Sequence, residues 1–229
     1  LALPFAVQAQ PRVTVALPSA RATAPQDGRL LFLLSRDSTA EPRFQVGFGA
    51  NTQLVFGSDV EGWAPGAVRA VPGDAFGFPI RALKDVPAGT YRVQAFLNRY
   101  ETFRLADGRV LKLPPDRGEG QQWASKPGNL FSTPRTIVWD PARASTIALS
   151  LDNEIAPLPD PATRETKYVK YVRIRSERLS TFWGRDMFLA AWVLLPWGFD
   201  DHPQSRYPLA VYHGHFPMSL SGWRETPPD

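Results

Sequence analysis

Short segments rich in Val, Ile, Phe and Tyr recur along residues 1–150, and Gly, Pro, Asp and Asn separate them. Several of these segments alternate apolar with polar residues, which is the period of a β-strand with one buried face. The 23 prolines and 17 glycines are spread through the gaps, so long helices have little room to form. We predict strands at Val13–Leu17, Arg29–Ser35, Phe44–Phe48, Thr90–Asn98, Val110–Leu113, Thr136–Trp139 and Thr146–Leu151, with Ile80–Lys84 as the best helical candidate.

Seven short strands joined by turns predict an immunoglobulin-like β-sandwich over residues 10–152. In the stretch LKDVPAGTYRVQAFLN, Gly89 precedes Tyr91 by two residues at the entry to an alternating strand. This is the layout of a tyrosine corner, in which the phenol hydroxyl bonds to the backbone a few residues upstream. The alternative is that Tyr91 is simply a half-buried strand residue. Either interpretation makes the segment part of the scaffold.

Composition excludes several classes of protein. A chain of 229 residues with 43% hydrophobic residues can fill a core. The net charge of +4 is dispersed with no run of like charges, which predicts no nucleic-acid partner. The absence of Cys excludes disulfides, thiolate nucleophiles and Cys-based zinc sites. No segment approaches the roughly 20 apolar residues of a membrane span.

The opening sequence LALPFAVQAQ bears on localisation. Its apolar residues lead into Val7-Gln8-Ala9, which has small residues where signal peptidase requires them. We therefore interpret residues 1–9 as a signal peptide remnant and expect a secreted or periplasmic protein. The alternative is a first strand or a flexible terminus.

A Pro-rich segment divides the chain. Residues 153–166, NEIAPLPDPATRET, carry three prolines within five residues and few large apolar side chains, which predicts a linker. The segments KYVKYVRIRS, MFLAAWVLLP and YPLAVYHG follow, and the last two are continuously apolar. Such runs are typical of strands buried on both faces of an α/β sheet. We expect a second domain to begin at residue 167 and to continue to residue 229.

The histidines do not predict a metal site. His213 and His215 form an HxH half-site for zinc, but the glycine between them breaks strand geometry. The third histidine, His202, has only Asp200 and Asp201 nearby as further ligands. We expect no metal and no cofactor.

Two carboxylate pairs occupy Gly-rich sequence: Asp59 with Glu61, and Asp116 with Glu119, the second pair interrupted by Arg117. Paired carboxylates serve glycosidases and calcium sites, but neither pair has the further ligands of an EF-hand. Solvated loop charge is the favoured interpretation.

The series FWGRDMFLAAWVLLPWGFDDHPQSRYPLAVYHGHFP runs from Phe182 to Pro217. A strand ending in Leu-Pro meets a Gly-Phe-Asp turn, and Tyr-Pro then opens a strand that ends in His-Gly. This series resembles the start of the catalytic domain in the esterase family of α/β hydrolases that includes esterase D and enterochelin esterase. Its members carry "LP.GFD" or "LP.GYD" before "YPV.Y..HG", and the match covers roughly the last fifty residues, from about Arg173. The resemblance implies a mainly β chain, with the sandwich followed by the first strands of an incomplete α/β-hydrolase domain.

The resemblance also implies where the chemistry lies. In this fold the loop after the His-Gly strand gives a backbone N–H to the oxyanion hole. Gly214 would permit the close approach, and the amide of His215 or Phe216 would be the donor, because Pro217 has no N–H. The sequence HFP departs from the HGGG form of other hydrolases, so the donor is open between these two amides.

The chain contains no G-x-S-x-G, and Ser219 and Ser221 lack the strand and glycine that precede a nucleophile. We expect a Ser-His-Asp/Glu triad beyond Asp229, no hydrolase activity in this chain alone, and a small-molecule or polymer ester as substrate of the intact parent. The alternative is a secreted β-sandwich module that binds carbohydrate or a cell surface. Its stacking platforms would be Trp63, Trp123 and the group Trp183, Trp192 and Trp197.

Overall fold

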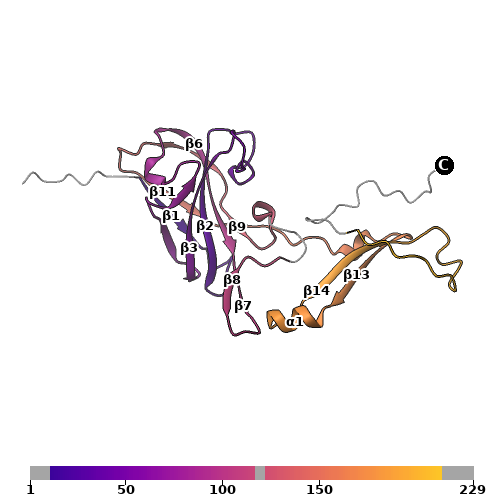
Figure 1. Ribbon diagram of the computed structural model, residues 1–229. Helices are drawn as coiled ribbons and strands as arrows, with labels where there is room; N and C mark the ends of the chain where they lie inside the picture. Colours follow the sequence, from indigo (N-terminus) through magenta and orange to yellow (C-terminus); the bar gives the residue numbers. More distant parts are fainter. Residues whose placement is uncertain (1–10, 117–121, 213–229) are drawn as a thin grey trace, which may run out of the picture. The chain divides into compact units, whose positions relative to one another are not determined.

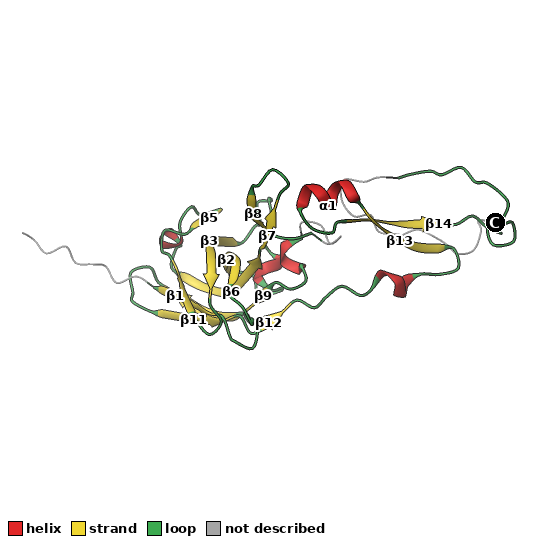
Figure 2. Ribbon diagram, turned by 90° about the horizontal axis from the view of Figure 1, so that it is seen from below, coloured by secondary structure: helices red, strands yellow, loops and turns green. Residues whose placement is uncertain are grey.

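The structure is a computed structural model that describes residues 11–116 and 122–212 (Figure 1). The described residues are mainly β, as predicted, and contain a single α-helix, α1 (Glu177–Trp183). Figure 2 shows the strands in yellow and the helices in red. The described residues form two compact units: 11–101, 112–115 and 122–157 make the first, and 102–111, 116 and 158–212 make the second.

Two sheets make up the first unit. The smaller has the order β11-β1-β4, in which β1 runs parallel to β11 and antiparallel to β4. The larger has the order β12-β9-β6-β2-β3-β5, and β10 also pairs with β6. The strands are β1 (Arg12–Ala16), β2 (Gln26–Ser35), β3 (Leu54–Trp63), β4 (Val68–Val71), β5 (Phe76–Phe78), β6 (Gly89–Arg99), β9 (Leu130–Phe131), β10 (Arg135–Trp139), β11 (Thr146–Ser150) and β12 (Asn153–Glu154).

The main core of the first unit draws side chains from both sheets. Alternate residues of β2 point into it, and Leu30, Phe32 and Leu34 are fully buried. In the register of β2 with β6, Phe32 lies opposite Ala95 and Leu34 opposite Val93, which are equally buried. Burying a large apolar side chain contributes roughly 1.5–3 kcal/mol, so the alternating pattern both sets the register and stabilises the unit.

Tyr91 forms the predicted tyrosine corner. Its ring is buried, and its hydroxyl donates to the carbonyl oxygen of Pro87 at 3.1 Å. The guanidinium of Arg36 donates to the same hydroxyl at 3.0 Å. The bond to a carbonyl four residues upstream confirms the tyrosine corner over a half-buried strand residue.

Six of the seven strands predicted in residues 1–150 are present, within a few residues at their ends. The strand predicted at Phe44–Phe48 is wrong, because this segment holds a short 3₁₀ helix at Pro42–Phe44 and then a loop. The Arg43 guanidinium covers the Phe44 ring at 4.4 Å, and Phe48 is fully exposed. The helix predicted at Ile80–Lys84 is also wrong, since only a 3₁₀ turn at Leu83–Asp85 forms.

Strand β3 is the main element that sequence patterns missed. It pairs with both β2 and β5, so it lies inside the larger sheet. Asp59 and Glu61 belong to this strand, and their prediction as loop residues is therefore wrong. Strand β3 was not predicted because its polar residues and glycines have low strand propensity. These residues still form the backbone hydrogen bonds that pair β3 with its neighbours.

The second unit contains an antiparallel pair, β13 (Val169–Arg175) and β14 (Phe188–Leu194), with α1 in the connection. The side chain of Ser176 caps α1 by accepting from the amide of Leu179, and Gly184 ends it with a positive φ of 63°. The tip of the hairpin formed by β7 (Glu101–Arg104) and β8 (Val110–Leu113) belongs to this unit. Phe103 contacts Trp183 edge to face, with ring centroids 5.4 Å apart.

Two predictions for this unit are wrong within the described residues. Tyr207–Tyr212, most of the expected YPLAVYHG strand, contains no strand. Strand β14 is not buried on both faces, because Leu189 is 58% exposed. Among the described strands, β14 pairs only with β13. A strand needs neighbours on its edges and a covering layer on its faces, and neither follows from its own apolar residues.

The predicted linker at 153–166 begins with β12 and contains a 3₁₀ helix, Pro161–Arg164. The division between the two units falls within it, between Pro157 and Leu158. Residues 1–9, interpreted as a signal peptide remnant, lie outside the described residues. In the part of the chain that is described, no helix has both the length and the apolar character needed to cross a membrane.

Candidate functional site

The residues predicted to form the oxyanion hole, Gly214, His215 and Phe216, lie outside the described residues, as does His213. His202 lies in the turns after β14 and is exposed, with Asp200 and Asp201 beside it in sequence. Across 11–116 and 122–212, no group of three or more His, Asp or Glu side chains could hold a metal ion.

The carboxylates of β3 form ion pairs rather than a catalytic pair. Asp59 pairs with Arg29 at 2.8 Å, and Glu61 with Lys112 at 3.2 Å. Lys112 also pairs with Asp27 at 3.1 Å. The Gly62 amide donates to Asp27, which with Lys112 holds the pKa of this carboxyl below its ordinary value. Because basic groups pair with both Asp59 and Glu61, we assign these carboxylates a structural role.

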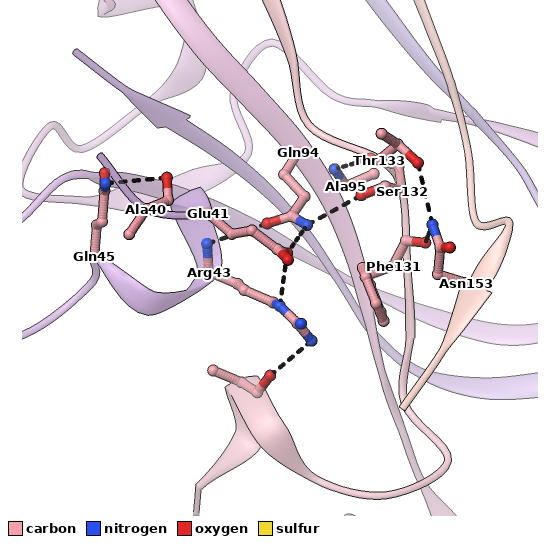
Figure 3. Close-up of polar contacts among 11 residues, drawn as sticks. Ala40, Glu41, Arg43, Gln45, Gln94, Ala95, Phe131, Ser132, Thr133 and Asn153 are labelled. Atoms are coloured by element: carbon pink, nitrogen blue, oxygen red, sulfur yellow. Dashed lines mark hydrogen bonds and ion pairs between the residues drawn. The ribbon is translucent and has the colours of Figure 1, made fainter. Parts of the chain in front are cut away.

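A buried polar cluster lies where a loop meets strand β6 (Figure 3). Gln94 is fully buried, and its amide nitrogen donates to Glu41 at 2.8 Å and to the carbonyl of Ser132 at 3.0 Å. Its amide oxygen accepts from the backbone of Arg43 at 3.2 Å. The Arg43 side chain donates to Glu41 at 2.9 Å and to the carbonyl of Ala124 at 3.0 Å.

The hydrogen bonds of this cluster indicate a structural role, in which it holds the loop against strand β6. The Ser132 hydroxyl accepts from the amide of Ala95 at 2.9 Å, and no histidine is among the residues that bond to it. The Arg43 guanidinium lies 3.9 Å from the centroid of the Phe131 ring. A nucleophilic serine needs a base within hydrogen-bond reach, so Ser132 has the wrong partners for that role.

A shallow hollow of about 410 Å³ lies beside the cluster. Hydroxyl groups, one guanidinium and one carboxylate surround it, and the Ser150 hydroxyl donates to Asp152 at 2.7 Å. These groups could bind a small polar molecule, but no histidine is among them to serve as the base of a serine triad. The lining residues are Ala16, Ser132, Thr133, Arg135, Ala148, Leu149, Ser150 and Asp152.

Trp63 and Trp123, two of the predicted stacking platforms, are not exposed rings. Trp63 is 1% exposed, and its indole N–H lies 3.3 Å from the carbonyl of Ala67. Trp123 is half-buried and contacts Phe96 edge to face at 5.1 Å. Trp63 is therefore a core residue, and Trp123 covers an aromatic ring of the larger sheet.

The other three predicted platforms, Trp183, Trp192 and Trp197, each contact aromatic rings, and no two of them share a partner. Trp183 contacts Phe103 and Phe182, and Trp192 lies against Tyr171 with the Arg164 guanidinium 5.1 Å above it. Trp197 is 68% exposed and stacks on Tyr168. The predicted group thus separates into a packed ring, a ring covered by a cation, and an exposed ring.

The Tyr168–Trp197 pair is an aromatic stack in which the Trp197 ring is exposed. The rings are 5.4 Å apart with an interplanar angle of 29°, and the Lys167 ammonium lies 5.2 Å from the Tyr168 centroid. The amide of Leu195 donates to the carbonyl of Tyr168 at 2.7 Å, which ties the two segments together. The sequence predicted Trp197 as a stacking platform but not Tyr168. Pairing the two apolar segments as a hairpin would have placed Tyr168 beside Trp197.

Comparisons with protein-family models, with curated proteins and with solved structures found no match to this chain.

Proposed function

We propose that the chain is the N-terminal portion of a secreted or periplasmic esterase-like α/β hydrolase in which an immunoglobulin-like β-sandwich precedes the catalytic domain. The observation that carries this proposal is the series LPWGFD and YPLAVYHG, between Leu195 and Gly214. In the intact parent, a serine beyond Asp229 attacks the ester carbonyl, and a histidine takes its proton.

Features of the first unit support the sandwich. Its main core draws on two sheets, and Tyr91 makes the tyrosine-corner bond that is common in immunoglobulin-like domains.

Features of the second unit support the start of a larger domain. Strands β13 and β14 form an antiparallel pair, which mixed α/β sheets accommodate at an edge. Val172, Ile174 and Leu189 are exposed on one face of this pair, and a surface of this kind is normally covered by another layer.

The reading frame after the codon for Asp229 provides the first test. We expect a G-x-S-x-G sequence about a hundred residues on, followed by an acid and a histidine. The full-length product should hydrolyse p-nitrophenyl acetate, and a serine-reactive phosphonate should abolish the activity. A stop codon at this point, or turnover that survives the phosphonate, would contradict the proposal.

Two matched substitutions test the oxyanion loop in the full-length product. His215→Pro and Phe216→Pro each remove one backbone N–H. The variant that loses the donor should show a kcat lower by about 10²–10³, with a smaller change in KM. The other variant serves as its control. Equal, small effects of both would place the oxyanion hole elsewhere.

A further inference from the structure

The β13–β14 hairpin has α1 at one end (Figure 2), and Trp197 follows β14 at the other end. Tyr168 precedes β13 and Trp197 follows β14, so the pairing of the strands brings the two rings together. Trp197 is 68% exposed although it is among the most costly side chains to leave in water. A large exposed ring that is already stacked on one neighbour is a platform with little conformational freedom left to lose.

The backbone on both sides holds this platform in place. Two consecutive turns follow Pro196: the Phe199 amide donates to the Pro196 carbonyl at 3.2 Å, and the Asp201 amide to the Gly198 carbonyl at 3.1 Å. Phe199 also contacts the Tyr207 ring at 5.6 Å, which closes the loop. The platform is therefore preorganised by hydrogen bonds and ring contacts.

The polar groups around the platform are mixed in charge. The carboxylate of Asp201 and the imidazole of His202 lie within 4 Å of the position a Cβ of Gly198 would take, next to Trp197 in the chain. The Lys167 ammonium lies 5.9 Å from the Trp197 centroid. The Asp201 carboxylate and the Lys167 ammonium have opposite charges, so the platform lacks the cluster of cations that a phosphate backbone requires.

We propose that Tyr168, Trp197 and the polar groups beside them form a binding site for a neutral saccharide chain. One face of a pyranose ring carries C–H bonds that pack against the negative face of an aromatic ring. Its hydroxyls both donate and accept, and the site offers the Asp201 carboxylate as an acceptor and the Lys167 ammonium as a donor. Recognition by an aromatic surface with a few convergent polar groups is common for small ligands. This site does not depend on the hydrolase proposal.

Affinity gel electrophoresis of the 229-residue chain tests the site, with soluble xylan and hydroxyethyl cellulose as probes. We expect at least one polymer to retard the chain, with little dependence on salt. Trp197→Ala should weaken that binding about tenfold or more, the cost of losing one stacking surface. Trp197→Phe should restore part of it. Phe48→Ala, which removes a fully exposed ring elsewhere, is the matched control.

The remaining outcomes overturn the proposal. No retardation by either polymer, or equal retardation of the wild type and Trp197→Ala, would remove the site. Salt-sensitive binding of poly(dT) that Lys167→Ala abolishes, with no binding of either polysaccharide, would assign the platform to single-stranded nucleic acid instead. Unchanged circular dichroism and melting temperature of each variant separate loss of binding from loss of fold. None of these outcomes bears on ester hydrolysis by the full-length product.

Discussion

Strands β2 and β14 have similar apolar sequences but different surroundings. In β2, Leu30 is fully buried in the main core, whereas Leu189 of β14 is 58% exposed. Strand β2 has β3 and β6 on its two edges, whereas β14 has β13 as its only neighbour among the described strands. The apolar side chains of a strand favour burial. How many of them are buried depends on the number of strands beside it and of layers that cover its faces.

The two faces of the β13–β14 pair also differ in what covers their apolar side chains. In the second unit, Arg173 lies 3.4 Å from the Phe188 centroid, and Arg164 lies over Trp192. One face of the β13–β14 pair is thus partly covered by cations of the same unit. The face that holds Val172 and Ile174 carries aliphatic side chains, both exposed.

The largest expected effect compares two leucines. Leu30→Ala should destabilise the first unit by about 3 kcal/mol, because it removes buried methyl groups and leaves a cavity. Leu189→Ala should cost less than about 0.5 kcal/mol, as for most exposed positions. Urea unfolding followed by tryptophan fluorescence measures both. A loss above about 2 kcal/mol for Leu189→Ala would contradict the contrast and show that β14 is covered in solution.

A glycine pair tests the close contact between Gly184 at the end of α1 and Arg104 in the β7–β8 hairpin. A Cβ on Gly184 would lie 2.4 Å from the carbonyl oxygen of Arg104, and φ is 63°. Gly184→Ala should therefore destabilise this unit by about 2–3 kcal/mol. At Gly108, φ is 87° but the space is open, so Gly108→Ala should cost only about 1 kcal/mol.

Thermal unfolding of both glycine variants gives the measurement. If the two cost the same, the hairpin tip does not pack on the end of α1 as described.

Two tyrosines extend the comparison to hydrogen bonds. Tyr91→Phe removes a hydroxyl that donates to the Pro87 carbonyl and accepts from Arg36, which should cost about 1–1.5 kcal/mol. Tyr171→Phe removes a hydroxyl that bonds to no other described residue, so its effect should be close to zero. Urea midpoints at constant m-value report both. A neutral Tyr91→Phe would show that the tyrosine corner adds nothing to stability.

The smallest expected effect concerns pH. Because the pKa of Asp27 is lower in the folded chain than its ordinary value of 3.8, its ionised form contributes stability above that value. This contribution is lost as pH falls through the lower, folded pKa. Asp27→Asn should therefore lose less stability than the wild type between pH 5 and pH 3. Asp74→Asn, at an exposed carboxylate, is the control and should follow the wild type.

The alternation of apolar and polar residues predicted β1, β2, β6, β10 and β11, because each of these strands places one apolar face on a core. The spacing of Gly89 and Tyr91 predicted the tyrosine corner. Alternation failed for β3, where polar residues lie on a strand held by two neighbours. It also failed for Phe44–Phe48, whose aromatic residues have no strand beside them. In the candidate site it found Trp197 but not its partner Tyr168, since their contact depends on the pairing of β13 with β14.

The sequence by itself determined the mainly β character of the chain and most of the strands of its first unit. It also carries the Leu-Pro-x-Gly-Phe-Asp series on which the proposed function rests. Tertiary structure alone decided which apolar residues are buried, that the carboxylates of β3 are paired with basic side chains, and which of the described tryptophans is exposed. The physical reason is that periodicity is a property of one segment, whereas burial and pairing depend on which other segments lie beside it.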